Sequence, residues 1–186
     1  MIAMLFGVSN VGKTTTGKKL AEKLGYTFID LDDEIKNKFQ TTLEIFTNEH
    51  PFSLERAKIK GEILKELISR HQEKLVIAVS PIYYAQHFNN LLELNGVTAI
   101  ELCDTAEHIF QRLVFSDEND VIYRDDAYKE EHRDYYMNDI HDDIAHAKQL
   151  FRKIKKKYFI DNQPVDKVVE GVLALIKDSE RSSLSP

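Results

Sequence analysis

The stretch GVSNVGKTTT, residues 7–16, lies between the apolar run Ile2–Phe6 and the start of an amphipathic segment. It fits the spacing G-x-x-x-x-G-K-[ST] of a phosphate-binding loop (P-loop), and between a strand and a helix this match is seldom due to chance. A glycine-rich loop brings backbone N–H groups close to a polyphosphate, and the following helix adds its positive dipole end. A plain glycine-rich turn is the alternative. The sequence therefore predicts a nucleoside triphosphate site formed by Gly7, Asn10, Val11, Gly12, Lys13, Thr14 and Thr15.

The segments around this loop alternate between strand and helix patterns. Apolar runs predict buried strands at Ile2–Phe6, 27–29, 75–79 and 98–102, and a weaker run predicts a fifth strand at 158–160. Helical periods run through residues 51–71 and 135–154 and after Pro164. This order favours a parallel sheet that is covered on both faces, because parallel strands need crossover helices. We therefore expect an α/β fold, a three-layer α/β/α sandwich.

Size and composition restrict the class of protein. A chain of 186 residues, 42% of them hydrophobic, fits a single domain, which we place at 1–178 with a frayed tail at 179–186. The formal net charge of -6 disfavours nucleic acid and anionic membranes as partners. Cys103 is the one cysteine, so an internal disulfide cannot form and a cytoplasmic location is expected. We expect a monomer or weak dimer that binds small molecules.

Acidic residues follow the second predicted strand, in FIDLDDEI at residues 28–35. Because ligands of open α/β sheets bind at the carboxyl ends of the strands, Asp30 can hold Mg²⁺ together with Thr14, and Asp32 can accept the proton of an attacking hydroxyl. Alternatively, Asp32 or Asp33 caps the next helix. The third strand lacks a terminal aspartate, which strengthens the case for Asp30 as the metal ligand. The chain has no Asn-Lys-x-Asp motif for guanine, so ATP is the expected nucleotide.

The residues quoted so far, with TTLEIF at 41–46, resemble the shikimate kinase family. The resemblance is good to about residue 70 and is topological beyond it. It implies a P-loop kinase fold with a five-stranded parallel sheet in the order 2-3-1-4-5. It also implies a helical lid at about residues 115–138 that closes over ATP. In the family, the aspartates matching Asp30 and Asp32 are associated with magnesium and with the acceptor hydroxyl.

The acceptor-binding motifs of the family are changed in this sequence. Ser53 stands where the family has an arginine that clamps the acceptor carboxylate, and the family's Gly-Gly-Gly is replaced by SPI, residues 80–82. The lid motif Arg-Pro-Leu is also absent. The nearest substitutes are Arg56 for the clamp, because a guanidinium binds a carboxylate bidentately, and Lys148 or Arg152 for a second arginine. We thus expect acceptor contacts from Asp32, Arg56, Ser80 and Lys148, and catalytic roles for Lys13, Asp32 and Arg124.

These features together predict an ATP-dependent kinase that transfers the γ-phosphoryl group to a hydroxyl of a small anionic acceptor, with Mg²⁺. Shikimate is one candidate, and a sugar acid, nucleoside or nucleotide is the alternative. A non-catalytic ATP-binding regulatory module is a second alternative, although such a module has no need of a base at Asp32. Tyr123, Tyr135 and Tyr136 flank the expected lid, where they either exclude water or simply pack.

Overall fold

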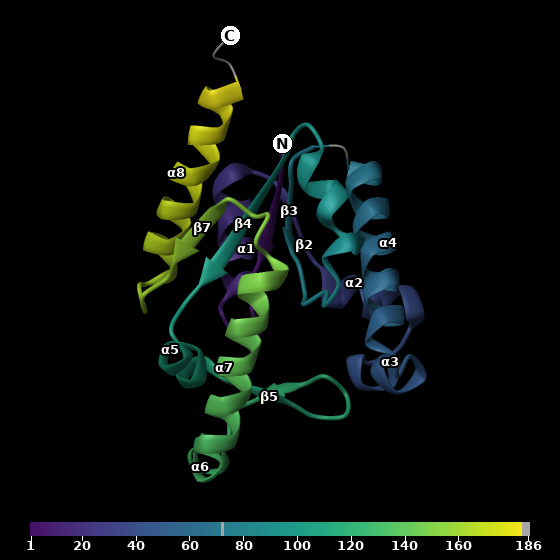
Figure 1. The fold of residues 1–186 in the computed structure, drawn as a ribbon, viewed down its shortest axis with the longest axis vertical. Coiled ribbons are helices and arrows are strands. Elements are labelled where there is room, and N and C mark those ends of the chain that lie inside the picture. Colours follow the sequence, from purple (N-terminus) through teal and green to yellow (C-terminus); the bar gives the residue numbers. More distant parts are fainter. Residues whose placement is uncertain (72, 184–186) are drawn as a thin grey trace.

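The computed structural model describes residues 1–71 and 73–183, and its centre is a five-stranded parallel sheet (Figure 1). The strand order is β2-β3-β1-β4-β7, which is the expected order 2-3-1-4-5 when the strands of this sheet are counted along the chain. All neighbouring pairs are parallel, so every strand presents its carboxyl end at the same edge. The strands are β1 (Ile2–Phe6), β2 (Thr27–Asp30), β3 (Leu75–Ala78), β4 (Val97–Cys103) and β7 (Lys156–Phe159).

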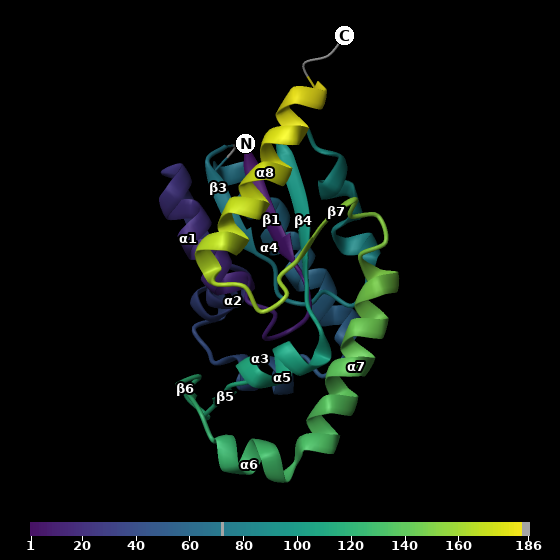
Figure 2. The same cartoon turned by 90° about the vertical axis from the view of Figure 1, so that its left-hand side faces the viewer.

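Helices cover both faces of the sheet, which confirms the three-layer sandwich (Figures 1 and 2). Strand β1 explains why both faces are apolar, because alternate side chains of a strand point to opposite faces. Met4 belongs to the core on the side of α2 (Leu31–Phe39), α4 (Ser53–His71) and α7 (Arg133–Leu150). Leu5 belongs to the core on the side of α1 (Lys13–Leu24) and α8 (Val165–Ser183).

The remaining elements lie mainly around the carboxyl edge of the sheet. A two-stranded antiparallel hairpin, β5 (Phe115–Ser116) and β6 (Ile122–Tyr123), and helix α6 (Asp126–Glu131) form the segment expected to be the lid. Phe115 is the centre of an aromatic cluster, 5.7 Å from the ring of Tyr123 and 5.7 Å from that of Tyr136. These two tyrosines, one from β6 and one from the start of α7, therefore pack against Phe115. The other elements are α3 (Leu43–Glu49), η1 (Ala85–His87), η2 (Asn89–Glu93) and α5 (Ala106–Arg112).

Two boundaries differ from the periodicity of the sequence. The helix expected at 135–154 is α7, which ends at Leu150, because the chain turns there to enter the sheet. In this turn the Phe151 N–H donates to the Ala147 carbonyl and the Ile154 N–H donates to the Phe151 carbonyl. Strand β7 begins at Lys156, two residues before the expected strand. Apolar residues after the helix continue its period because they fill the same core, not because the helix continues.

The C-terminal helix α8 is described to Ser183, and residues 184–186 of the expected tail lie outside the described residues. Within residues 1–71 and 73–183, none of the helices combines the length and apolar character that crossing a membrane requires.

Candidate active site

The P-loop joins β1 to α1 and has the backbone that its glycines allow. Gly7 and Gly12 have φ angles of +144° and +110°, which side chains of L-residues rarely permit. A Cβ atom on Gly7 would lie 2.6 Å from the Leu102 carbonyl oxygen. Gly12 caps α1 without a side-chain hydrogen bond, so the first-turn N–H groups have no side-chain acceptor from the cap. This geometry suits an anion at the helix N-terminus.

Lys13 is buried at the start of α1 and folds back onto the loop. Its Nζ donates to the carbonyl oxygens of Gly7 at 3.0 Å and Val8 at 2.8 Å. Burial lowers the pKa of Lys13 to about 8, and the charges of Asp32 and Asp30 act in the opposite direction. The ammonium group is therefore held in the loop, and no carboxylate of the described residues is in hydrogen-bond contact with it. A phosphate placed there would supply the missing negative charge.

Thr14 and Asp30, the predicted magnesium pair, are in contact. The Thr14 hydroxyl donates to Oδ2 of Asp30 at 2.6 Å, and Oδ1 of Asp30 accepts from the Asp32 N–H at 3.0 Å. Asp30 is therefore the residue that caps α2, and neither of the aspartates considered for that role does so. Burial raises the pKa of Asp30, and the bonds from Thr14 and the Asp32 N–H lower it. A hydroxyl and a carboxylate oxygen at this spacing fit Mg²⁺, which prefers hard oxygen ligands.

A magnesium ion at this place would need further ligands. Among residues 1–71 and 73–183, no group of three or more His, Cys, Asp or Glu side chains could hold a metal ion. Mg²⁺ often keeps water and takes phosphate oxygens as ligands beside one or two carboxylates. Thr14 and Asp30 are therefore suited to hold the ion when it arrives with a triphosphate.

Asp32 lies near Lys13, and its carboxylate is not used for capping. Its Oδ1 is 3.9 Å from Nζ of Lys60, and Lys60 also donates to the Pro81 carbonyl at 3.2 Å. Burial lowers the pKa of Lys60, and the charge of Asp32 opposes this effect. Lys60 was not among the predicted site residues. The spacing of Arg56 and Lys60, one turn apart on α4, was the signal that could have found it.

Two of the predicted acceptor residues lie near this group. Arg56 is half-buried and donates from Nη1 to the His50 carbonyl at 2.5 Å. Arg56 lies one helical turn before Lys60 on α4, so both side chains are on the same face of that helix. Ser80 is buried after β3, and its Oγ has no hydrogen-bond partner within the described part of the chain. A buried hydroxyl without a partner costs about 1–3 kcal/mol, so a ligand or water is expected to satisfy it.

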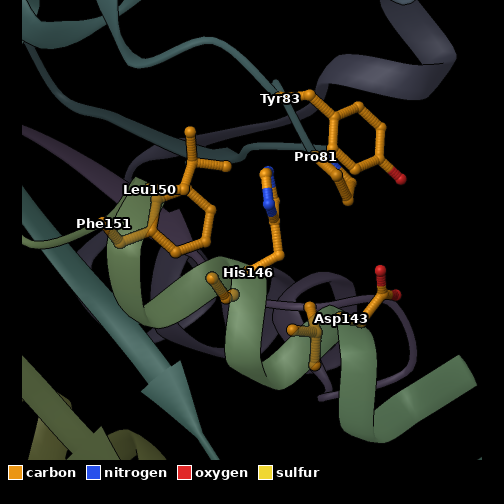
Figure 3. Close-up of a pocket in the computed structure, with 9 residues that line it drawn as sticks. Pro81, Tyr83, Asp143, His146, Leu150 and Phe151 are labelled. Atoms are coloured by element: carbon orange, nitrogen blue, oxygen red, sulfur yellow. The ribbon is translucent and has the colours of Figure 1, made fainter. Parts of the chain in front are cut away.

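Helix α7 and the segment after β3 face each other across a small cavity at the start of the P-loop (Figure 3). In Figure 3, His146 points between Phe151 and the Pro81–Tyr83 segment, and the carboxylate of Asp143 lies on the same side of α7. Burial raises the pKa of Asp143, and the charge of Asp139 adds to this effect. The cavity is lined by Gly7, Val8, Pro81, Tyr83, Asp143, His146, Ala147, Leu150 and Phe151.

The structure does not bring Lys148 to this cavity. Lys148 is exposed and lines a different cavity of about 430 Å³, with Cys103 of β4 and Phe159 of β7. Arg152, the other residue considered, is exposed directly after α7. The face of α7 at the P-loop thus carries an aspartate and a histidine where a basic residue was expected.

A third cavity, of about 210 Å³, adjoins the other end of the P-loop. Arg112 at the end of α5 is among its lining residues, and its Nε donates to the Asn10 carbonyl at 3.4 Å. Arg112 is held by Asp104, whose Oδ2 lies 2.6 Å from Nη2. Asn162 and Gln163 contribute from the loop after β7. Arg112 was not among the predicted site residues, and no sequence signal pointed to it.

Arg124, the predicted lid residue, is exposed directly after β6. The hydrogen bond from Lys129 lowers the pKa of Asp126, and the charge of Arg124 adds to that effect, so Arg124 lies near the start of α6. No hydrogen bond or ion pair joins Arg124 to the P-loop within residues 1–71 and 73–183. The structure therefore does not bring Arg124 together with Lys13 and Asp32.

Comparisons with known proteins agree with this arrangement. The family model of shikimate kinase matches residues 9–177. The shikimate kinase of Azobacteroides pseudotrichonymphae is 28% identical over 176 residues, which cover 92% of this chain and 97% of the relative.

Among solved structures, the shikimate kinase of Acinetobacter baumannii in complex with shikimate has a TM-score of 0.74 and 22% identity, covering 96% of this chain and 93% of that one. The shikimate kinase of Bacteroides thetaiotaomicron has a TM-score of 0.74 and 20% identity, covering 95% and 98%. These two structures support the fold. Because the family model spans most of the sequence, the chain belongs to the shikimate kinase family, whose members are ATP-dependent phosphotransferases with an alcohol group as acceptor.

Proposed function

We propose that this kinase transfers the γ-phosphoryl group of ATP, with Mg²⁺, to a hydroxyl of a small anionic acceptor, and that shikimate is the first acceptor to test. The observation that carries the proposal is the position of Asp32. Its carboxylate neither caps α2 nor forms a hydrogen bond with another described side chain, and it lies beside Lys60 and within electrostatic range of Lys13. A carboxylate there can orient an acceptor hydroxyl and take its proton.

On the nucleotide side, the P-loop amides and Lys13 would hold the phosphates. Lys13 exchanges the two carbonyl contacts of the loop for phosphate oxygens and stabilises the negative charge that develops during transfer. Thr14 and Asp30 would hold Mg²⁺, which neutralises charge between the β- and γ-phosphates when bound. The cavity beside Arg112 would hold the base. Arg124 would add a positive charge only after the lid moves.

On the acceptor side, Arg56 and Lys60 would hold the anionic group, and Ser80 would satisfy its buried hydroxyl with an acceptor oxygen. Binding of shikimate by the Acinetobacter baumannii relative supports the choice of the first acceptor. The changed side chains on α7 support including other polyhydroxy acids in the panel.

A coupled assay of ADP release with ATP and Mg²⁺ tests the proposal. Shikimate, quinate, gluconate, neutral sugars and nucleosides are compared, with the rate without acceptor as the reference. Stimulation by one compound identifies the acceptor. If ATP binds with measurable heat but no compound stimulates ADP release, the chain is a nucleotide-binding module and the proposal is wrong.

We also propose that the enzyme acts in the cytoplasm as a monomer or weak dimer. The single cysteine supports a reducing compartment, since the chain cannot depend on an internal disulfide. Light scattering coupled to gel filtration tests the oligomeric state, and a stable tetramer would contradict it.

A further inference from the structure

Asp143 is a half-buried carboxylate in the wall of the cavity at the P-loop. No hydrogen bond or ion pair joins it to any other side chain in the described part of the chain, although other aspartates at this edge are bonded. A carboxylate in this state has up to four lone-pair positions for donors and none to offer as a donor itself. A ligand that lies against this wall could therefore bond to Asp143 without displacing a protein partner.

Asp143 also lies near the reacting end of the site, because Gly7 and Val8 of the P-loop line the same cavity. Burial lowers the pKa of Lys13, and Asp143 is one of the negative charges that oppose this effect. Burial raises the pKa of Tyr83, and the charge of Asp143 adds to that effect. Asp143 thus lies within electrostatic range of both the phosphate-binding lysine and the residue across the cavity. An acceptor whose hydroxyl reaches the γ-phosphate would pass beside it.

Two aromatic side chains, Tyr83 and His146, line the cavity beside Asp143. The rings of Tyr83 and His146 lie 5.6 Å apart, and Tyr83 is 44% exposed (Figure 3). An exposed aromatic face next to a carboxylate suits a ring that has C–H groups on one face and hydroxyls at its edge. The wall repels a carboxylate, since Asp143 carries the same charge. Positive charge is available at Lys60, which donates to the carbonyl of Pro81 across the cavity from α7, and one helical turn away at Arg56.

We propose that Asp143 determines acceptor specificity by accepting hydrogen bonds from two neighbouring hydroxyls of a polyhydroxylated acceptor, whose anionic group is turned toward Arg56 and Lys60. This inference rests on the proposed kinase function and adds the orientation of the acceptor and the residue that selects it. A site built to bond a hydroxyl rejects an analogue that lacks it, because the carboxylate is left without a partner. The affinity that Asp143 contributes should therefore depend on the number of hydroxyls on the acceptor.

The test compares the best acceptor from the panel with analogues that each lack one hydroxyl. Asp143→Asn is measured beside Asp142→Asn, a matched control on the exposed neighbouring position of α7. We expect Asp143→Asn to raise the KM for the full acceptor by about tenfold or more, to reduce its preference over one deoxy analogue by a similar factor, and to change the KM for ATP by less than about twofold. Asp142→Asn should resemble the wild type. Asp143→Glu, which keeps the carboxylate, should retain part of the discrimination.

Melting curves of the three variants establish that each is folded before the kinetics are compared. If Asp143→Asn raises the KM for all acceptors by the same factor, or behaves like Asp142→Asn, then Asp143 does not bond to specific hydroxyls of the acceptor. The inference is then wrong, while the kinase function stands. If the wild type phosphorylates no acceptor at all, the proposed function fails, and this inference fails with it.

Discussion

The nucleotide side and the acceptor side of this site are built in different ways. The proposed nucleotide side comes from one continuous stretch, residues 7–16, and would bind through backbone N–H groups and one buried lysine that already has two hydrogen bonds. The proposed acceptor side takes its residues from four separate segments, with Asp32 from α2, Lys60 from α4, Ser80 and Tyr83 from the segment after β3, and Asp143 from α7. Two of its groups, Ser80 Oγ and the Asp143 carboxylate, have no hydrogen-bond partner in the described residues.

This difference indicates which half can change in evolution without loss of the chemistry. A loop that binds through its backbone depends on a few glycines, and their replacement is strained at φ angles of +144° and +110°. Side chains that converge from several elements can be exchanged one at a time. The catalytic half therefore keeps a motif, whereas the acceptor half can bind a different ligand within the same fold.

The largest expected effect tests the nucleotide side. Lys13→Ala should reduce kcat by about 10³-fold or more, because it removes the positive charge that stabilises the transferring phosphoryl group. Steady-state ADP release measures the loss. Lys23→Ala, on the exposed surface of the same helix, is the control. Near-normal turnover by Lys13→Ala would show that the P-loop does not act as described.

The next effect separates the two halves. Asp32→Asn should cut phosphoryl transfer by about 10²–10³-fold and leave ATP affinity nearly unchanged, since the residue acts on the acceptor hydroxyl. Calorimetric titration with ATP and Mg²⁺, beside the kinetic assay, measures both quantities. Asp33→Asn is the matched control, because Asp33 is exposed and pairs with Lys36. Equal losses in both variants would remove the case for Asp32 as the base.

The pH dependence of ATP binding sharpens the description of Lys13. Its pKa of about 8 in the ATP-free protein should rise when phosphates surround the ammonium group. Binding then takes up a proton at pH values between the free and bound pKa. At pH 8.5 the uptake should be about three quarters of a proton, and affinity should fall by up to about tenfold per pH unit above pH 8.

Calorimetry in two buffers of different ionisation enthalpy measures this proton uptake. ATP itself is fully ionised above pH 8, so the uptake reports on the protein. The Lys13→Ala variant should lose it. Binding with no proton uptake in the wild type would mean that another environment surrounds the lysine.

The smallest expected effect concerns the connection of the lid to helix α3. Oδ2 of Asp120, at the tip of the β5–β6 hairpin, accepts from the Leu43 N–H at the start of α3 at 2.9 Å. Asp120→Ala should destabilise this docking by about 0.5–1.5 kcal/mol, because one hydrogen bond is lost. Amide hydrogen exchange at Leu43 should become faster, whereas exchange in α1 should not change. Asp120→Asn, which keeps an acceptor oxygen, should have a weaker effect, and faster exchange in both regions would contradict a local role.

Local patterns were sufficient for much of the nucleotide side. The apolar runs placed the four strands β1 to β4 to within about two residues, because burial on both faces requires continuous apolar sequence. The motif placed Lys13 and Thr14 at the start of α1. Because the carboxyl ends of parallel strands meet at one edge of the sheet, the sequence also predicted that Thr14 lies next to Asp30. The roles of these residues in binding ATP and Mg²⁺ stay predictions.

Helix α7 shows why the acceptor side could not be derived in the same way. Its apolar period was visible in the sequence, but residues on either side of that stripe face different cavities. Asp143 and His146 lie toward the P-loop and Tyr83, whereas His141 and Lys148 lie toward β4 and β7. A helical period gives the relative angle of two residues on one helix and does not say what each side contacts.

The sequence by itself determined the phosphate loop, the alternation of strands and helices and the membership of a kinase family, because these depend on residues close together in the chain. The tertiary structure alone decided that Asp30 caps α2, that Lys60 accompanies Asp32, and that Asp143 rather than Lys148 lines the cavity at the P-loop. The physical reason is the distance along the chain between the residues that interact. Backbone conformation and periodicity are fixed by near neighbours, whereas the surroundings of a side chain depend on packing between segments distant in sequence.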